Sequence, residues 1–464
     1  MSESYTGHAV KTPRIRAPDP SLPWVIAFVA AAISFGFGAY WLSAVGVGAF
    51  AYYLVRLLQE AGVDLPIESF ILVMASMQWI IGPVLDYAGL SNHWKYRMTV
   101  PAEEYMALAV PGVIALSLGL YAFRSKKRIG LVSHYAGITR DIVSRTQFLP
   151  FYLIGIGFIF SFLVHKFPPA LAFPAYILSN IKYIGLIYLI FSHRQKNKGL
   201  ILALAFFLTF VSSLRGAMFH DLLLWSAFIG MYAAYVFRPS NAQKALAMLM
   251  GLAFIFVLQA VKDDYRSKLR EEGRGQNIQK FLSSVDERLI DDETANSSNV
   301  ERLVIRINQG WIISAVMVNV PRTIPHAGGE TIVTAIKTSA LPRILYPDKP
   351  IAGGKANFEK YTGYLLQRST SMGISLLGEA YINFGVRGAW VFMFFFGLFS
   401  SFVIKQFFLL ASTYPTIWLW FPLILLHFVK AETELLVQLN FILKSIIMVY
   451  AFVWANKHFL RLKL

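Results

Sequence analysis

The chain has 464 residues, of which 56% are hydrophobic and only 15% are charged, and its mean hydropathy is +0.53. Because a soluble domain usually has about 25% charged residues, this composition excludes an ordinary soluble protein and predicts a polytopic membrane protein. The net charge of +17 does not indicate nucleic-acid binding, since the basic residues outside residues 262–388 lie mainly in short loops and tails, as is typical of membrane proteins.

Residues 1–22 contain Lys11, Arg14, Arg16 and several prolines and show no apolar periodicity, so we expect a disordered cytoplasmic tail. The first apolar run starts late and continues into further runs, which does not fit a cleavable signal peptide. Repeated apolar runs then predict an all-α protein with about twelve transmembrane helices. The predicted spans are 24–43, 44–59, 69–87, 105–123, 148–167, 171–191, 199–214, 216–237, 245–261, 389–410, 416–429 and 436–455.

The positively charged loops predict the orientation of these spans. Basic residues collect in the N-terminal tail, at 123–128 with Arg140 and Arg145, at 193–198, at Arg238 with Lys244, and in the C-terminal tail. The positive-inside rule makes that side cytoplasmic, so both termini are expected inside and residues 262–388 outside. The predicted organisation is a cytoplasmic tail (1–22), an N-terminal transmembrane bundle (23–261), a large periplasmic loop domain (262–388), C-terminal transmembrane helices (389–457) and a cytoplasmic tail (458–464).

The insert 262–388 has two parts. Residues 261–299 are highly charged and are expected to be helical with a loop, whereas 301–320 show an amphipathic pattern that predicts a helix lying against the membrane surface. In LPRILYPDKP (341–350), prolines with fixed φ hold Arg343, Asp348 and Lys349 in place. An exposed pair of charges contributes little to stability, so a purely structural role explains this motif poorly.

Glu379 is the best candidate for a general base. It precedes a span beside Leu376 and Leu377, and apolar surroundings could raise the pKa of a carboxylate towards neutral pH. A capping or interfacial carboxylate is an equally good interpretation. The histidines show no metal-ligand spacing, and the chain has no cysteine, so no metal site is expected.

Several arginines could bind phosphate oxygens with a bidentate fork. Arg215 in SSLRG lies between two apolar runs on the predicted outer face, where a snorkelling interfacial arginine is the alternative. Arg302, Arg306 and Asn308 could face a polyanionic headgroup or lie on a solvated helix face. Lys430, Glu432, Glu434, Gln438 and Asn440 form either a second wall of the same cavity or a salt-bridged structural cluster.

No P-loop, dinucleotide-binding glycine pattern or nucleophile elbow is present, so no ATP-driven or covalent machinery is expected. An outward-facing basic site with carboxylates suits a lipid-pyrophosphate substrate, because arginines stabilise the leaving pyrophosphate and a carboxylate deprotonates an attacking hydroxyl.

LPRILYPDKP, followed by ST and by LGEAYINFG before a span, resembles the oligosaccharide repeat-unit polymerases of bacterial surface polysaccharides, the O-antigen polymerase or Wzy-type family. HWKYRMTVPAEEYMALAVPG (93–112), SSLRG (212–216) and RINQG (306–310) also resemble landmarks of that family. The resemblance extends from about the third span to the last.

This resemblance implies a GT-C-like membrane glycosyltransferase of the bacterial inner membrane. Such enzymes join repeat units carried on undecaprenyl pyrophosphate at the periplasmic face, without a metal or other cofactor. Arg215, Arg306 and Arg343 would then bind pyrophosphate or position the donor, Glu379 would be the base, and Tyr381 and Asn383 would shape the sugar site. A chain-length regulator and a flippase are candidate partners.

Two alternatives remain open. The first is an O-antigen-ligase-like transferase; such ligases are usually discussed with a histidine in the periplasmic loop, and His326 is the only histidine of this insert. The second is a transporter of lipid-linked oligosaccharides, for which Lys182 and Lys444 inside predicted spans are the best evidence. A transporter would predict inverted repeats, and the sequence shows none.

Overall fold

The computed structural model describes residues 18–460 except 92, 126–127, 193–196, 217–218, 272–276, 290–294, 342–345, 347–348, 351–353 and 368–369. Within these residues every regular element is helical, which confirms the all-α prediction. The helices are α1 Leu22–Gly36, α2 Trp41–Glu60, α3 Ile67–Ser76, η1 Met77–Ile81, α4 Gly82–Tyr87, α5 Ala102–Tyr121, α6 Arg128–Arg145, α7 Leu149–Leu163, η2 Val164–Lys166, α8 Pro169–Phe191, α9 Lys198–Gly216, α10 His220–Phe237, α11 Asn241–Glu271, α12 Asn277–Leu289, α13 Ala295–Ile307, α14 Gly310–Asn319, α15 Glu330–Ala340, α16 Lys355–Thr362, α17 Ser375–Thr413, η3 Pro415–Trp420, α18 Phe421–Leu425, α19 Leu435–Ala455 and η4 Asn456–Leu460.

Eight helices of the described chain are long and apolar enough to cross a membrane, or nine if the bent pair α6–α7 is one span. The sequence predicted about twelve. The difference comes from short apolar helices such as α1, whose 15 residues reach only about 22 Å and fall short of a hydrocarbon core of about 30 Å. The eight spans are Trp41–Glu60, Ile67–Tyr87, Ala102–Tyr121, Phe173–Phe191, His220–Phe237, Asn241–Leu258, Ser375–Thr413 and Leu435–His458.

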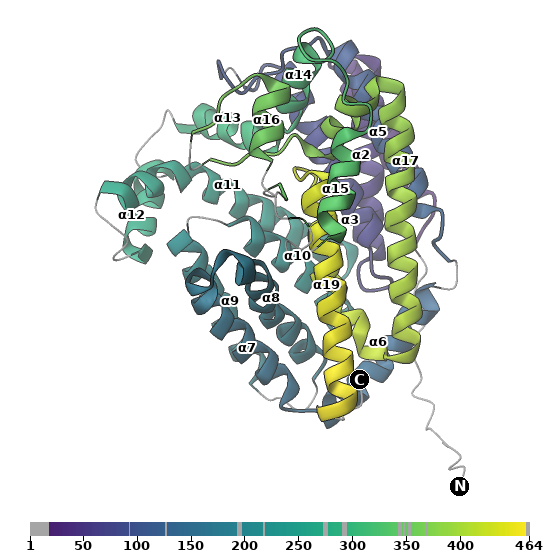
Figure 1. Cartoon of the computed structure of the whole chain (residues 1–464), viewed down its shortest axis with the longest axis vertical. Helices are drawn as coiled ribbons and strands as arrows, with labels where there is room; N and C mark the ends of the chain where they lie inside the picture. The colour runs from purple at the N-terminus through teal and green to yellow at the C-terminus, as the bar shows by residue number, and fades with distance from the viewer. Residues whose placement is uncertain are drawn as a thin grey trace.

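Close approach of backbones at glycines holds the largest helix pair together. In Figure 1, α17 runs along the right flank of the molecule, and α5 packs against it. A Cβ at Gly119 of α5 would lie 2.2 Å from the carbonyl oxygen of Phe394, and a Cβ at Gly397 of α17 would lie 2.4 Å from that of Leu116. Glycines therefore allow the backbones of α5 and α17 to approach each other closely, as is common between membrane helices.

The loops meet in two groups at opposite ends of the bundle. At one end, Thr99 donates to Ser314 Oγ and Lys430 pairs with Asp221. At the other end, Lys244 Nζ donates to the carbonyl of Leu58. The grouping of loops agrees with the alternation predicted from the positive charges; which compartment each end faces stays a prediction. Figure 1 shows α13, α14 and α16 at the upper end and α6 at the lower end.

The insert differs from its predicted form in two ways. Helix α11 continues past residue 261 to Glu271, and α17 begins at Ser375, so both predicted boundaries fall inside helices. Residues 301–320 do not form one surface helix. The helix is interrupted at Asn308 and Gln309. The following α14 is buried over most of its length, because most of its own side chains are apolar on every face.

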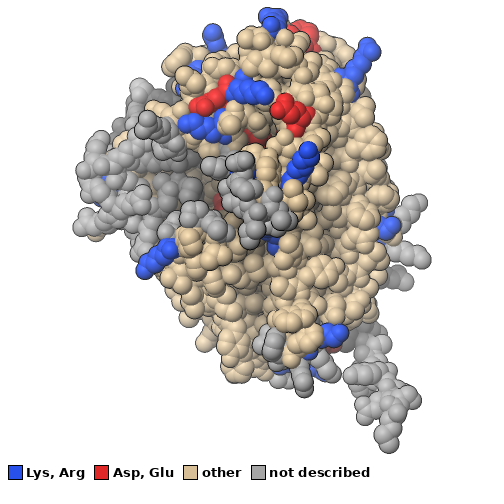
Figure 2. All heavy atoms as spheres, in the orientation of Figure 1, with Lys and Arg blue, Asp and Glu red and all other residues tan. Residues whose placement is uncertain are grey.

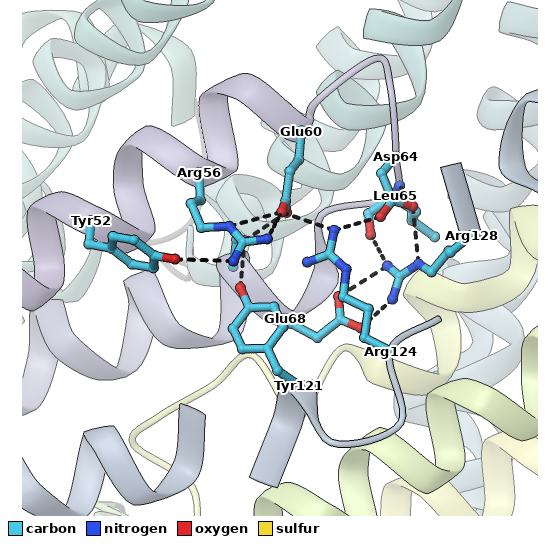
Figure 3. Close-up of polar contacts among 10 residues, drawn as sticks. Tyr52, Arg56, Glu60, Asp64, Leu65, Glu68, Tyr121, Arg124 and Arg128 are labelled. Atoms are coloured by element: carbon cyan, nitrogen blue, oxygen red, sulfur yellow. Dashed lines mark hydrogen bonds and ion pairs between the residues drawn. The ribbon is translucent and has the colours of Figure 1, made fainter. Parts of the chain in front are cut away.

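A buried network of ion pairs joins α2, the loop before α3, and the segment that leads from α5 into α6 (Figure 3). Arg124 Nη2 lies 2.9 Å from Glu60 Oε1 and 2.7 Å from Asp64 Oδ2. Arg128 contacts the carboxylates of both Asp64 and Glu68, and Arg56 pairs with Glu60. The network contains three arginines and three acids, so its formal charges cancel. Arg124 and Arg128 belong to the predicted cytoplasmic basic loop 123–128, and their acidic partners are not evident from the sequence.

Candidate functional site

Polar side chains gather at the upper end of the bundle, around the segment 426–434 between α18 and α19. Figure 2 shows charged side chains grouped at that end, whereas the flanks formed by α17 and α19 are mostly uncharged. Helices α8, α10 and α13 meet the segment here. We name the six residues that they bring together the polar cluster: Tyr176, His220, Asp221, Arg306, Lys430 and Glu432.

Asp221 holds three elements together. It is the second residue of α10, where the free amides of a helix N-terminus favour a negative charge. Lys430 Nζ lies 2.7 Å from Oδ1, and the Tyr176 hydroxyl donates to Oδ2 over 2.7 Å. Since Lys430 is buried, this pair fixes the segment 426–434 against α8 and α10.

Glu432 faces the more open part of the polar cluster. Its Oε1 lies 3.7 Å from His220 Nε2, and its Oε2 lies 3.6 Å from Arg306 Nη2. Burial acts to raise the pKa of Glu432, but His220, Arg306 and Lys430 outweigh it and lower that pKa below its ordinary value. Glu432 is therefore ionised at neutral pH. The side chains of Arg306 and Glu432 are 38% and 23% exposed, so a ligand can reach both.

Several buried polar atoms beside the polar cluster have no hydrogen-bond partner among the described residues. They are His220 Nε2, both ring nitrogens of His427, and Gln438 Oε1. Burial, followed by the charge of Lys430, lowers the pKa of His427 to about 3, so this ring is neutral. Because buried polar groups are normally paired, these atoms indicate a place for water or a ligand.

Glu379 lies in the first turns of α17 and is buried beside the N-terminus of α19. Its Oε1 accepts a hydrogen bond from Thr331 Oγ1 at 2.9 Å, and its Oε2 accepts one from the amide of Leu435 at 2.8 Å. Leu435 is the first residue of α19, whose amides have no partner within the helix. Both carboxylate oxygens of Glu379 are therefore engaged by the protein.

A second buried carboxylate, Glu434, interacts electrostatically with Glu379. It accepts hydrogen bonds from the amide of Ile374 at 3.1 Å and from Asn357 Nδ2 at 2.9 Å. Burial raises the pKa of Glu434 in spite of these two bonds. The two carboxylates tie α16, α17 and α19 together below the polar cluster.

A family model described as a domain of unknown function (DUF8712) matches residues 91–459. The chain belongs to this family. The match includes the whole polar cluster and begins after α1–α4. No curated protein and no solved structure matches the chain. The description of DUF8712 names no activity, so the function has to be argued from the residues.

Of the three predicted pyrophosphate-binding arginines, the structure describes the side chain of one, Arg306. Arg306 lies in the polar cluster, whereas Arg343 and the side chain of Arg215 lie outside the described residues, as does Asp348. The backbone of Arg215 belongs to the last turn of α9, five residues before His220. Lys349 donates to the carbonyl of Leu341.

Asn308, Tyr381 and Asn383 have buried structural contacts. Asn308 Oδ1 accepts a hydrogen bond from the backbone amide of Trp311 at the start of α14. The Tyr381 hydroxyl donates to the carbonyl of Val320, and Asn383 Nδ2 donates to Thr331 Oγ1 and to the carbonyl of Glu379. Arg302 lies in α13 one turn before Arg306 and is half-buried. His326 Nδ1 lies 3.2 Å from the carbonyl of Ile382.

Sequence reasoning missed His220, Asp221, His427 and Tyr176. His220 and Asp221 follow SSLRG closely, at the same predicted helix end, and this proximity was a usable signal. Lys430 and Glu432 were recognised as one possible wall. Within the described residues no group of three or more His, Asp and Glu side chains is arranged to hold a metal ion.

Proposed function

We propose that the protein is a membrane glycosyltransferase that polymerises oligosaccharide units carried on a polyprenyl pyrophosphate, at the periplasmic face of a bacterial inner membrane. The polar cluster carries the proposal: at the insert end of a membrane bundle it presents an accessible arginine, a histidine–carboxylate pair and unpaired buried polar atoms. The motif resemblance supports the same reaction. About twelve spans and a GT-C-like arrangement are part of this proposal.

In this mechanism cations bind the pyrophosphate and stabilise its charge as it leaves the donor sugar. Arg306 has the exposure and the planar fork for phosphate oxygens, and Arg215, Arg343 and Lys349 are the further candidates that the motifs indicate. The acceptor hydroxyl loses its proton to a base while its oxygen attacks the anomeric carbon and the pyrophosphate–sugar bond breaks.

The base in this proposal is His220, and the carboxylate of Glu432 stabilises the imidazolium that forms. A neutral imidazole beside a carboxylate is a common proton acceptor. His220 Nε2 has no hydrogen bond to another described residue, so it can accept the proton of an incoming hydroxyl. The carboxylate of Glu432, whose Oε1 lies 3.7 Å away, then pairs with the imidazolium. Glu379, the base predicted from the sequence, is buried and accepts a hydrogen bond on each oxygen, so the partly exposed His220 is the more accessible group.

The first test compares glycans of cells that lack the protein with those of wild-type cells, together with the lipid-linked pool. Loss of long chains with accumulation of single repeat units is the expected result. Full-length polymer stranded on the lipid carrier would indicate a ligase instead. Repeat units trapped at the cytoplasmic face would indicate a transporter, and the buried Lys182, bound to Ser161 and to the carbonyl of Ser179, would then become the relevant charge.

Variants of the polar cluster refine this test. We expect Arg306→Gln and His220→Gln to abolish long polymer while the membrane level and thermal stability of the protein stay unchanged, because both side chains are partly exposed. Arg322→Gln is the matched control, since Arg322 is an exposed arginine of the same insert outside the polar cluster. Wild-type chain lengths in both cluster variants would refute the assignment.

A further inference from the structure

A second hollow, which we name the aromatic pocket, lies between the loop before α5 and the segment after α16. Its volume is about 320 Å³, which falls within the usual size of small-ligand sites. It is separate from the polar cluster and uses part of the motif at 93–112. Six residues line the aromatic pocket: Trp94, Lys95, Arg97, Thr99, Tyr364 and Leu365.

The loop that carries Trp94 is fixed at several points. The Tyr87 hydroxyl donates to the carbonyl of Val100, and the amide of Met98 donates to Asp86 Oδ2. Both the amide and the hydroxyl of Thr99 donate to Ser314 Oγ over 3.1 Å. The indole of Trp94 nevertheless remains 78% exposed. An aromatic ring held in solvent on an anchored loop does not contribute to the core and is available for binding.

The lining of the aromatic pocket combines flat rings with positive charge. Trp94 and Tyr364 provide aromatic surfaces, Lys95 and Arg97 provide cations, and none of the lining residues is acidic. The apolar C–H face of a sugar ring packs on an indole, and a carboxylate or phosphate group on the sugar accepts hydrogen bonds from guanidinium and ammonium groups. This combination fits an acidic saccharide better than a neutral one.

Helix α16 connects the aromatic pocket with the reaction site. At its start, Lys355 Nζ donates to the carbonyls of Leu366 and Gln367, which adjoin the pocket residues Tyr364 and Leu365. Two residues later, Asn357 Nδ2 donates to Glu434, beside the polar cluster. One short helix thus contacts both the segment that lines the aromatic pocket and the residue Glu434 next to the polar cluster.

We propose that the aromatic pocket binds a sugar unit that carries a negatively charged substituent, at a place separate from the polar cluster. This inference rests on the proposed function, because it assigns the substrate of that activity to the class of acidic glycans.

The test measures binding by calorimetry, with the full-length protein in nanodiscs of neutral phosphatidylcholine. Hexagalacturonate is the acidic probe and maltohexaose the neutral one. We expect hexagalacturonate to bind at least tenfold more tightly than maltohexaose, and Trp94→Leu and Arg97→Gln each to weaken it about tenfold. Trp454→Leu, which removes an exposed tryptophan from α19, is the control and should bind like wild type. No binding to the wild-type protein, or equal binding by Trp94→Leu, would overturn the proposal.

A lipid surface is the competing occupant, and a spin label distinguishes it. The chain has no cysteine, so a nitroxide on Leu365→Cys reports this site alone. We expect the nitroxide to be more accessible to a water-soluble nickel complex than to oxygen. Greater accessibility to oxygen would place the pocket in the membrane interface and overturn the proposal. If the purified protein binds hexagalacturonate but deletion cells show no polymer defect, the proposed function is refuted. The assignment of the pocket to acidic saccharides would not be affected.

Discussion

Two roles can be assigned to the carboxylate of Glu379: general base in the reaction, and hydrogen-bond acceptor at the start of a neighbouring helix. Its oxygens accept from Thr331 and from the first amide of α19, so it completes a helix N-terminus from a neighbouring helix. A general base would have to reach the substrate, whereas Glu379 is almost fully buried. The position of Glu379 in the sequence could not decide between these roles, because the α19 amide lies 56 residues away along the chain.

A substitution that keeps the shape of Glu379 separates the two roles. In Glu379→Gln the amide oxygen can accept from Leu435 and the amide nitrogen can donate to Thr331, so we expect polymer and stability close to wild type. Glu379→Ala leaves the Leu435 amide buried without a partner and should lose about 1–3 kcal/mol of stability. Glycan banding and thermal unfolding measure both effects, with the exposed Glu330→Gln as control. Loss of polymer in Glu379→Gln at unchanged stability would return the role of base to this residue.

At the scale of helices, the ion-pair network of Figure 3 joins the first part of the bundle to the rest. Glu60, Asp64 and Glu68 belong to α2, to the following loop and to α3, and their partners Arg124 and Arg128 come just after α5 and at the start of α6. A buried ion pair contributes little compared with an apolar replacement of both partners, but loss of one partner leaves an isolated buried charge.

We therefore expect Arg128→Met to be strongly destabilising. It would leave the carboxylates of Asp64 and Glu68 without their main partner, at a cost of about 3–5 kcal/mol. Lys405→Met is the matched control, because Lys405 is an exposed cation near the same site and should change stability little. The denaturation midpoint of the purified protein in lipid measures the difference. Equal midpoints for the two variants would contradict the structural importance of the network.

Periodicity in the sequence predicted helices well and their ends less well. The apolar runs identified the membrane helices, but α11 continues beyond its apolar part to Glu271, and α17 includes additional turns before the break at Gly385. The sequence also did not predict the buried ion-pair network. Its three acids are spaced four residues apart, which was visible, but their arginine partners lie about 60 residues away and only the fold brings them together.

At the scale of the whole molecule, the residues that act together come from distant parts of the chain but from the same end of the bundle. The alternation of spans predicted this end for the insert, for the start of α10 and for the segment 426–434, and the contacts of Asp221 and Glu432 agree. The site could be located in this coarse way. Three of its members, Arg306, Lys430 and Glu432, were also predicted. Tyr176, His220 and Asp221 were not, because side-chain pairing across helices leaves no periodic trace in the sequence.

The orientation of the bundle can be measured directly, because the natural chain contains no cysteine. Thr323 lies in the exposed loop after α14, and Ser240 lies in the exposed loop between α10 and α11 at the other end. We expect a membrane-impermeant maleimide to label Thr323→Cys from the periplasm and Ser240→Cys only after permeabilisation of the membrane. The opposite pattern would place the insert in the cytoplasm and exclude the proposed reaction at the periplasmic face.

The break in α17 determines how deeply the protein sits in a bilayer. Gly385 has φ 64° and ψ −167°, so the helix ends there and resumes in a new direction. The part after Gly385 is on the order of 40 Å long, which already exceeds a hydrocarbon thickness of about 30 Å. The turns that carry Glu379 therefore stand at or above the lipid headgroups. Under the proposed function, the phosphates of a carrier lipid whose chain stays in the bilayer would lie near the depth of these turns, so the substrate would not have to be lifted out of the membrane.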